Sequence, residues 1–348
     1  MRFSMRIEII TTSNEALKET GFGTLKACHN VLDSIRRLGY TVTLNVCETA
    51  TDLDEVAKRK PDLVVLAVKY ISVENGSDIW LSDYFAKNGI NFTGSSREVL
   101  KFDSDKVLAK SYLRKKGIKT ADYFTAIPGQ YTCGSELPVR FPLFLKPLDA
   151  ANGNGIDDLS FVTNFSDYES KILSLYNLFG LPVLVEEYLD GSEFTVAVID
   201  TMYSDLIVSA VEVVPPQSTN GLRILGEKAK RDDSEKLKKS KNSKIMDRVR
   251  KLAVDTFNYL GVRDFGRIDV KVDGSGQCYF MEANLVPGMT SGSSYFPKAC
   301  EIENQISYDD MIGLILDEGL RRVSLVSSPG TNGSLTETLT AVPEPLAV

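Results

Sequence analysis

The first 97 residues alternate short apolar runs with stretches of helical apolar spacing. The apolar runs predict strands at 7–10, 40–46, 63–68 and 90–93. The helical spacing predicts helices at 25–38 and 79–86, the first of them ending at Gly39. Strands that alternate with helices in this way are typical of a parallel sheet, so we expect a small parallel α/β domain over residues 1–97.

The pattern beyond residue 97 divides into two further units and a tail. Strands are predicted at 142–146, 183–188, 193–200 and 207–214. Helices are predicted at 105–116, with Ser104 as its N-cap, and at 168–179, 243–260 and 308–321. We expect a central unit over 98–190 and a C-terminal unit over 191–323. Residues 324–348 are rich in Ser, Thr, Gly and Pro, which predicts a disordered tail.

The segment 265–284 predicts a β-hairpin with two chemically different faces. A tight turn centred on Ser275 and Gly276 would join its strands. Strand alternation places six side chains on one face: Arg267, Asp269, Lys271, Phe280, Glu282 and Asn284. In this register Asp269 lies opposite Glu282, and Arg267 lies opposite Asn284.

Two carboxylates, an amide oxygen and a guanidinium then converge on one surface of the hairpin. Hard oxygen ligands in this number suit Mg²⁺ that carries nucleotide phosphates. Directly opposed carboxylates destabilise a sheet unless something neutralises them, and a bound cation would do so. We therefore interpret this face as a metal site, and a solvated polar face is the alternative.

Composition and charge narrow the class of protein. The chain has 348 residues, of which 43% are hydrophobic and 25% charged, as in a globular protein of about two to three domains. A net charge of −7 disfavours nucleic acid as a partner, and no apolar run is long enough to span a membrane. Five scattered cysteines without a Cys-x-x-Cys motif favour a reducing cytoplasm. The single histidine, His29, leaves no Ser-His or Cys-His triad.

Two lysines lie where phosphates could be held. Lys146 follows an apolar strand and precedes a Gly-rich loop, whose backbone N–H groups can approach phosphates. Lys106 lies in the first turn of a helix, where a cation opposes the helix dipole, and this indicates a role beyond helix stability. For each residue the alternative is an ordinary solvated lysine.

Three further segments carry candidate chemistry. Residues 184–196 mix acids into apolar sequence, which suits a purine and its ribose, and edge-exposed acids are the alternative. The charge-dense segment 228–244 is a solvated face with the mobility that a lid over an active site requires. The small-residue loop 285–294 offers hydroxyl and N–H groups to a substrate carboxylate, or is an ordinary Pro-Gly loop.

Taken together, these segments resemble the ATP-grasp superfamily and, within it, the D-alanine–D-alanine ligase family. The resemblance is carried by residues 184–196 and by three motifs: Gly-Arg-Ile-Asp-Val from Gly266, Met-Glu-Ala-Asn from Met281 and Pro-Gly-Met-Thr-Ser from Pro287. It implies an α/β (α+β) ATP-grasp fold of three domains, with ATP held between the central and C-terminal domains. It also implies a homodimer.

The resemblance implies a role for each matching residue. The ligands of two Mg²⁺ ions, or of Mn²⁺ in their place, would be Asp269, Glu282 and Asn284. The residues around ATP would be Lys106 and Lys146 at the phosphates, Glu186, Glu187, Tyr188 and Leu189 at the adenine, and Glu193 at the ribose. The catalytic residues would be Lys230 of the lid at the γ-phosphate, Arg267 at the developing oxyanion and Ser293 at the carboxylate of the amine substrate.

The chain departs from the family pattern around the acyl substrate. The family's His-Gly-x-Gly-Gly-Glu-x-Gly stretch corresponds to 67–77 here, which has no histidine and few glycines. The family's lid tyrosine is replaced by Arg231. The central loop offers Asn152 and Asn154, and the N-terminal acid of that network is Glu15 or Glu19. We therefore expect a different acyl substrate, and Arg231 and Lys69 could face a larger or more acidic one.

The resulting hypothesis is an ATP-dependent carboxylate–amine ligase that forms an amide through an acyl phosphate, with release of ADP and phosphate. Its partners would be a small-molecule carboxylate and an amino-acid amine, from amino-acid or natural-product chemistry. The alternatives are a true D-alanine–D-alanine ligase, a catalytically inactive ATP-binding module, and a kinase that stops at the phosphorylated product.

Overall fold

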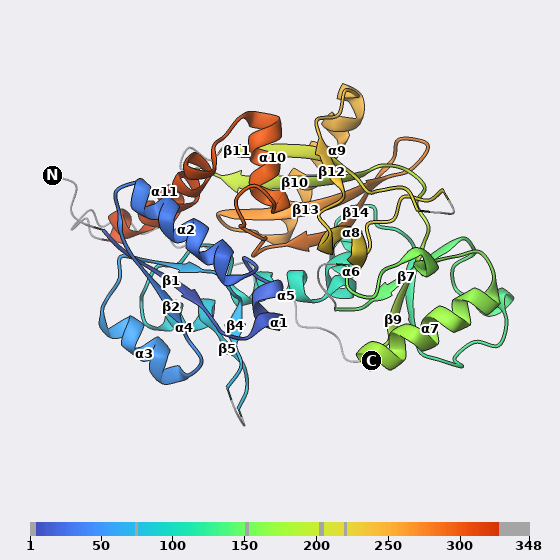
Figure 1. Cartoon of the computed structure of the whole chain (residues 1–348), viewed down its shortest axis with the longest axis horizontal. Coiled ribbons are helices and arrows are strands. Elements are labelled where there is room, and N and C mark those ends of the chain that lie inside the picture. The colour runs from blue at the N-terminus through green and yellow to red at the C-terminus, as the bar shows by residue number, and fades with distance from the viewer. Residues whose placement is uncertain (1–4, 74–75, 150–152, 202–204, 219–220, 327–348) are drawn as a thin grey trace.

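The structure is a computed structural model that describes residues 5–73, 76–149, 153–201, 205–218 and 221–326. Its N-terminal part is a three-stranded parallel sheet in the order β2-β1-β3. The strands are β1 (Arg6–Thr11), β2 (Thr41–Val46) and β3 (Leu63–Leu66), and the helices are α1 (Glu15–Glu19), α2 (Leu25–Arg37), α3 (Ala50–Lys58) and α4 (Leu81–Lys87). The predicted parallel α/β organisation is confirmed, and Figure 1 shows it at the left of the molecule.

Two short predictions in this part are wrong. Residues 90–93 form no strand in the described structure, where an isolated parallel bridge joins Phe92 to Val64. The helix expected at 79–86 begins later, because its first residues pair with another segment. This antiparallel pair consists of β4 (Tyr70–Ile71) and β5 (Ile79–Trp80). In both places a partner distant in sequence decides the structure, and local spacing does not contain that information.

The central part is a four-stranded antiparallel sheet in the order β6-β9-β7-β8. Its elements are β6 (Tyr123–Ala126), β7 (Leu143–Pro147), β8 (Phe161–Val162), β9 (Val183–Glu187), α7 (Phe165–Phe179) and 3-10 turns at Gly134–Glu136 and Asp158–Ser160. Helix α7 begins at the capping side chain of Asn164 and ends at Gly180, which adopts the left-handed conformation. It buries Ile172 and Leu175 against the sheet.

The C-terminal part is a five-stranded antiparallel sheet in the order β12-β11-β10-β13-β14. Its strands are β10 (Glu193–Asp200), β11 (Leu206–Val214), β12 (Lys236–Lys238), β13 (Phe265–Val272) and β14 (Cys278–Asn284). The helices of this part are α8 (Glu227–Arg231), α9 (Ser243–Leu260), α10 (Tyr295–Asn304) and α11 (Tyr308–Val326). The bounds predicted for β10 and α9 are confirmed, and the hairpin begins and ends at the predicted residues 265 and 284.

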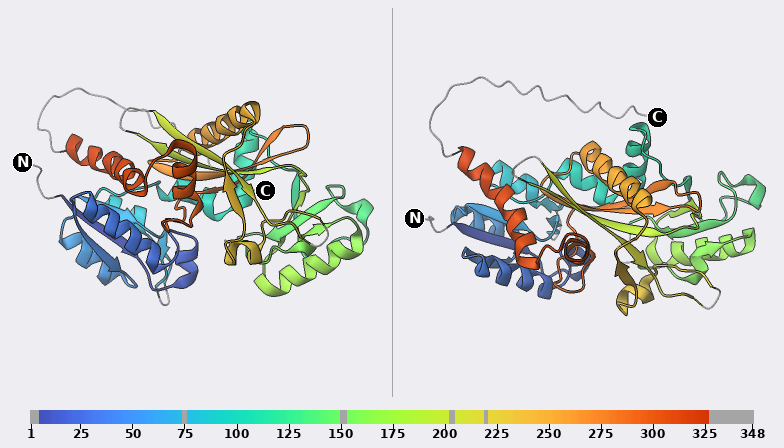
Figure 2. Two further views of the ribbon diagram at one scale, coloured as in Figure 1. Left: turned by 45° about the horizontal axis from the view of Figure 1, so that its top comes forward. Right: turned by 90° about the horizontal axis from the view of Figure 1, so that it is seen from above.

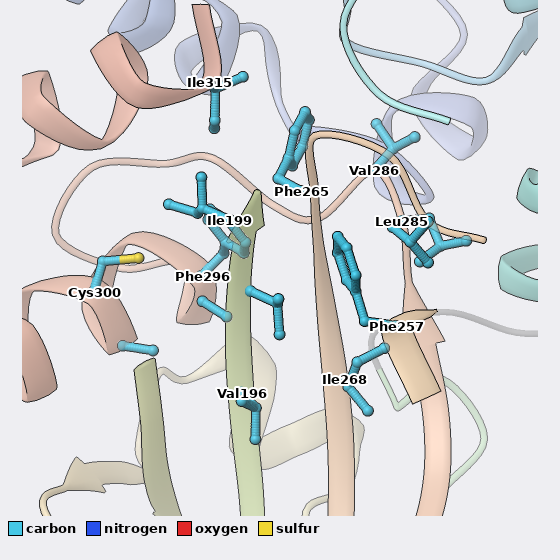
Figure 3. Close-up of a cluster of buried hydrophobic side chains, with 14 of the residues drawn as sticks. Val196, Ile199, Phe257, Phe265, Ile268, Leu285, Val286, Phe296, Cys300 and Ile315 are labelled. Atoms are coloured by element: carbon cyan, nitrogen blue, oxygen red, sulfur yellow. The ribbon is translucent and has the colours of Figure 1, made fainter. Parts of the chain in front are cut away.

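The two long faces of this sheet have different surroundings. Helices α9 and α10 pack against it from opposite sides, as the right-hand view of Figure 2 shows. Figure 3 shows part of the buried core, to which α9 contributes Phe257 and α10 contributes Phe296. Phe265 lies edge-on to Phe296 at 5.9 Å between ring centroids, so the odd-numbered side chains of β13 point to the α10 side. That side therefore carries Arg267 and Asp269.

Two helices precede the central sheet in sequence but pack elsewhere. They are α5 (Arg97–Ser104) and α6 (Lys106–Lys115). Both pack against β14, and their apolar residues join the core of the C-terminal sheet. The prediction that Ser104 caps the second helix is wrong, because Ser104 belongs to α5 and the carboxylate of Asp105 accepts the N–H of Leu108 at 2.8 Å. The domain limits given above remain our proposals.

The last helix returns the chain to the N-terminal sheet. Arg322 of α11 forms a bidentate ion pair with the fully buried carboxylate of Asp264. The same carboxylate also accepts a hydrogen bond from the N–H of Gly94 at 2.7 Å. This contact joins the N-terminal and C-terminal parts. Within the described residues, no helix has the length and apolarity needed to cross a membrane. The predicted tail lies outside the described residues, apart from 324–326, which continue α11.

Candidate active site

A cleft with an open volume of about 1110 Å³ is lined by both antiparallel sheets, α6 and α8. The structure brings most of the sequence-predicted site residues together here. Those that line the cleft are Lys106, Lys146, Glu186, Glu187, Tyr188, Leu189, Glu193, Lys230, Asp269 and Glu282. They are spread from Lys106 to Glu282 along the chain, so the cleft is a product of tertiary packing.

The hairpin at the floor of the cleft has the predicted register at its functional end. Asp269 pairs with Glu282, and Arg267 pairs with Asn284. Beyond Asp269 the register shifts by one residue at a β-bulge, in which Met281 is the extra residue. The predicted placement of Phe280 on the face of Lys271 is therefore wrong, because Tyr279 takes that position.

Asp269 is the most closely bonded acid of the cleft. Arg267 donates to its two carboxylate oxygens from Nε and Nη2, at 3.0 and 2.8 Å. Thr195 of the neighbouring strand donates to Oδ1 at 2.7 Å, and Asn284 donates to Oδ2 at 3.3 Å. These four contacts hold the carboxylate in one orientation although the residue is buried.

Glu282 is surrounded by cations from four separate elements. Lys106 of α6 lies 3.9 Å from Oε2, and Arg267 of β13 lies 3.9 Å from Oε1. Burial alone would raise the pKa of Glu282, but the charges of Lys106, Lys230, Lys146 and Arg267 outweigh it and lower the pKa to about 2. Glu282 is therefore an anion at neutral pH, at a point where positive charge is concentrated.

A buried ion triad that the sequence did not predict lies beside this point. Glu186 forms ion pairs with Lys146 of β7 and with Lys110 of α6, each at 2.7 Å. Burial would raise the pKa of Glu186, but the two ammonium groups lower it to about 2. Lys110 follows Lys106 by one helical turn, so both lysines point to the cleft from the same face of α6. This four-residue spacing from Lys106 is the sequence signal by which Lys110 could have been predicted as a site residue.

The wall predicted to hold adenine and ribose is built from β9 and the turn after it. The carboxylate of Glu187 accepts the backbone N–H of Asp122 at 2.9 Å. The ring of Tyr188 packs edge-on against Phe161 at 4.5 Å between centroids. Glu193 lies 3.7 Å from the ammonium group of Lys271, and its pKa is raised by burial. This wall presents aromatic and carboxylate groups to the cleft.

The segment that carries Lys230 lies against the central part of the chain. The backbone N–H of Glu227 donates to the carbonyl of Ile156 at 3.0 Å. A Cβ added to Gly226 would lie 2.4 Å from the same carbonyl oxygen, so only glycine permits this approach. Lys230, in the middle of α8, lines the cleft. The segment predicted to be a lid is therefore in contact with the loop after β7 and contributes Lys230 to the lining of the cleft.

Some predicted residues lie beside the cleft or away from it. Among the described residues, the lining of the cleft does not include Arg267, Asn284 or Ser293. Arg267 and Asn284 nevertheless bond to Asp269, which does line the cleft. Lys69 is buried and pairs with Asp103 at 2.5 Å, so it does not face a substrate.

The other residues proposed for the acyl substrate have local partners. Arg231 is exposed and pairs with Glu227, 3.4 Å away on its own helix. Glu15 is exposed and pairs with Lys18, and Glu19 is exposed. Asn152 lies outside the described residues. The structure therefore assigns none of these side chains to the cleft among the residues that it describes.

The acids of the cleft fit a metal ion that arrives with a nucleotide. Within the described part of the chain, no three His, Cys, Asp or Glu side chains gather closely enough to hold a metal by themselves. Asp269 and Glu282 supply two carboxylates, and Asn284, which donates through Nδ2, keeps its amide oxygen as a third ligand. Mg²⁺ commonly takes one or two carboxylates and completes its shell with water and substrate phosphates.

Comparisons with known proteins agree with this geometry. Residues 112–317 match the family model described as D-ala D-ala ligase C-terminus. The D-alanine–D-alanine ligase of Aquifex aeolicus is 24% identical over 317 residues, which are 90% of this chain and 100% of that protein.

Two solved structures share the fold. The D-alanine–D-alanine ligase from Bacillus anthracis complexed with ATP has a TM-score of 0.70 at 22% identity and covers 92% of this chain and 99% of its own. The VanG D-Ala:D-Ser ligase from Enterococcus faecalis has a TM-score of 0.69 at 20% identity and covers 91% of this chain and 100% of its own. The ATP-grasp fold predicted from the sequence is confirmed.

Proposed function

Because this chain belongs to the D-alanine–D-alanine ligase family, we propose that it is an ATP-dependent carbon–nitrogen ligase that joins a carboxylate to an amine through an acyl phosphate. ATP would lie in the cleft between the two antiparallel sheets, with its adenine against β9 and its phosphates towards β13 and β14. The products would be an amide, ADP and inorganic phosphate.

One observation carries the proposal: two opposed carboxylates at the cleft floor are surrounded by cations from separate elements. Asp269 and Glu282 pair across the hairpin, and the charges of Lys106, Lys146 and Lys230 all act on Glu282. If these charges served only to stabilise the fold, one cation for each acid would be enough. An excess of cations around a carboxylate pair instead suits a triphosphate with its metal, in which the negative charge of the phosphates completes the balance.

The first step is phosphoryl transfer, which needs positioning and neutralisation of charge rather than covalent help from the protein. A carboxylate oxygen of the acyl substrate attacks the γ-phosphorus, and the bond from that phosphorus to the β-bridging oxygen breaks to release ADP. Lys230 would reach the γ-phosphate from the lid, while Lys106 of α6 and Lys146 of β7 would bind the phosphate chain. Mg²⁺ bound to Asp269, Glu282 and Asn284 would neutralise charge on the transferred group.

The second step is attack of the amine on the acyl carbon, after which the bond from that carbon to the phosphate oxygen breaks, inorganic phosphate leaves and the nitrogen loses a proton. The tetrahedral intermediate places negative charge on the former carbonyl oxygen, and Arg267 is the fixed cation next to it. Burial would lower the pKa of Arg267, but Asp269 raises it, so the guanidinium stays charged. Loss of one such donor costs on the order of 10²–10³ in rate in other acyl-transfer enzymes. Ser293 would orient the carboxylate of the amine substrate.

The substrates distinguish the main proposal from its closest alternative. The missing histidine and the loss of most glycines at 67–77 favour an acyl substrate other than D-alanine. Arg231 gives this choice no support, because it pairs with Glu227 on its own helix. A true D-alanine–D-alanine ligase is the alternative within the family. We also propose a homodimer in the cytoplasm. Five free cysteines support a reducing compartment, and light scattering of the purified protein tests the dimer.

Transfer of ¹⁸O from substrate to phosphate tests the mechanism directly. The purified protein is screened for ADP release with Mg·ATP, paired amino acids and larger carboxylates, and active pairs are repeated with an ¹⁸O-labelled carboxylate. The proposal predicts one ¹⁸O atom in the released phosphate and a condensed amide by mass spectrometry. ADP release with D-alanine alone identifies the family alternative. A phosphorylated product without an amide identifies a kinase, and ATP binding without turnover identifies a binding module.

A further inference from the structure

Tyr295, at the start of α10, touches both the lid and the guanidinium that the proposed reaction uses. Its hydroxyl donates a hydrogen bond to the carboxylate of Glu235. Its ring lies under Arg267, with the guanidinium carbon 5.5 Å from the ring centroid. Tyr295 also lines the cleft, in which Lys230 lies. One side chain therefore connects three parts of the site that are distant in sequence.

Glu235 belongs to the lid, between α8 and β12, and its burial is unusual for this segment. Its neighbours Arg231 to Ser234 and Lys236 are exposed, whereas Glu235 is 7% exposed. Its Oε2 is buried and, within the described part of the chain, accepts no hydrogen bond. Burial of a carboxylate with few hydrogen-bond partners is unfavourable in free energy, so the hydrogen bond from Tyr295 contributes much of the stabilisation that keeps Glu235 buried.

The Tyr295 side of the contact is rigid. Helix α10 packs against β10 and β11, and the next residue, Phe296, is fully buried against Phe265. Burial and the carboxylate of Glu235 both raise the pKa of Tyr295, so its hydroxyl remains a proton donor at neutral pH. Any movement on closure would therefore be that of the lid.

We propose that Tyr295 is a positioning residue that couples closure of the lid to alignment of Arg267. When the segment 227–238 closes, Glu235 reaches the hydroxyl of Tyr295 and fixes the ring beneath the guanidinium. The same closure brings Lys230 to the phosphates. The inference rests on the proposed function, and it adds a link between the phosphate end and the acyl-transfer end of the site.

The other charged residues at this end of the lid do not provide such a link. Arg231 pairs with Glu227 and Asp232 on the same short helix. Lys228 pairs with Asp232 at 2.8 Å. Within the described segment 227–238, Glu235 is the residue whose side chain bonds to α10, whereas Lys239, just beyond it, pairs with Glu303 at the other end of that helix. The bond from Tyr295 to Glu235 joins a neutral donor to a charged acceptor, which is stronger than a neutral pair.

Hydrogen exchange of the lid is the first test, because it needs no turnover. Backbone exchange of a peptide covering 227–238 is measured by mass spectrometry in full-length protein with Mg²⁺ and a non-hydrolysable ATP analogue. Tyr295→Phe and Glu235→Gln should each speed exchange about ten-fold, in line with the loss of a hydrogen bond to a charged group. Asp232→Asn is the matched control, because it removes an exposed lid acid that does not reach α10.

Measurements of turnover then distinguish the role of the Tyr295 hydroxyl from that of its ring. Tyr295→Phe keeps the ring under Arg267 and should raise the KM for ATP with little change in the ratio of amide to ADP. Tyr295→Leu also removes the ring, so it should in addition lower that ratio, because ADP forms without acyl transfer. In the double variant Tyr295→Phe with Glu235→Gln, the exchange effect should be no larger than in either single variant.

The failures of the inference and of the proposed function are distinguishable. If wild-type protein ligates and its lid is protected, but both variants exchange at the Asp232→Asn rate, the coupling proposed for Tyr295 is wrong. Additive exchange effects in the double variant would also overturn it. If the analogue protects the lid through Tyr295 but no substrate pair yields an amide, the coupling proposed for Tyr295 is supported and the ligase proposal is wrong.

Discussion

Arg267 donates two hydrogen bonds to Asp269, which lies two residues further along the same face of β13. The guanidinium is therefore locked in the plane of a carboxylate that is itself a candidate metal ligand. One geometric unit would serve both halves of the proposed reaction, because in that proposal the acid would face the phosphates and the cation would face the acyl carbon.

Replacement of Arg267 by lysine should slow amide formation by about 10²–10³, while ATP binding is largely kept. Lysine retains the charge but cannot make two parallel bonds to Asp269, so the cation loses its fixed position. The measurement is kcat for amide by mass spectrometry beside kcat for ADP release. Arg248→Lys, an exposed arginine that bonds to the hairpin turn at Gly276, is the control. An Arg267→Lys enzyme with near wild-type amide formation contradicts the oxyanion role.

The isosteric change Glu282→Gln should raise the Mg²⁺ concentration for half-maximal ADP release by about 10–100-fold, the range seen when groups that support a metal site are lost. The variant keeps the shape of the side chain but removes the charge on which the cations around it converge. Asp255→Asn, on the exposed surface ion pair of α9 with Lys251, provides the comparison. A Mg²⁺ curve that coincides with the Asp255→Asn curve would remove Glu282 from the metal site.

Lys110→Met should destabilise the fold by about 3–5 kcal/mol, because it leaves the buried Glu186 with one cation in place of two. In the wild type the folded-state pKa of Glu186, about 2, lies below the unfolded value. Its stabilising contribution is thus full above pH 4.5 and is lost as the pH falls towards 2.

The loss of one ammonium group raises the pKa of Glu186, so the same loss should begin at a higher pH in the Lys110→Met protein. Thermal unfolding followed by circular dichroism between pH 3 and 7 measures both effects. Lys115→Met, at the exposed end of the same helix, controls for the change in side chain. Parallel pH profiles for wild type and Lys110→Met would show that Glu186 does not depend on Lys110.

Gly226→Ala should prevent the lid from docking, since the added Cβ would lie 2.4 Å from the carbonyl oxygen of Ile156. We expect a KM for ATP at least about ten-fold higher, because closure normally adds contacts to the bound nucleotide. Steady-state ADP release with saturating second substrates measures it. Lys228→Ala, an exposed residue of the same lid helix, should leave KM unchanged. Equal KM values for the two variants would mean that the lid does not close at Gly226.

Much of the architecture was readable because it is local. Strand β10 and helix α9 have the predicted bounds, and the hairpin has the predicted outer limits. In each of them the side-chain period and the flanking turn or cap residues agree within a few positions. The predicted opposition of Asp269 and Glu282 is confirmed, but alternation from the observed turn would place Met281 opposite Asp269, and the bulge brings Glu282 there instead. The bulge at Met281 breaks that alternation, and no local signal predicted it.

By itself, the sequence determined longer elements such as β10 and α9, the chemistry of the hairpin face and the family resemblance, because periodicity and motifs are written in neighbouring residues. Tertiary structure alone decided that Lys110 would share Glu186 with Lys146, and that Glu235 of the lid would meet Tyr295. These partners stand 36 to 76 positions apart or belong to different sheets and helices. Their contact depends on how whole elements pack, and the burial that makes such charges matter arises only when those elements close over one another.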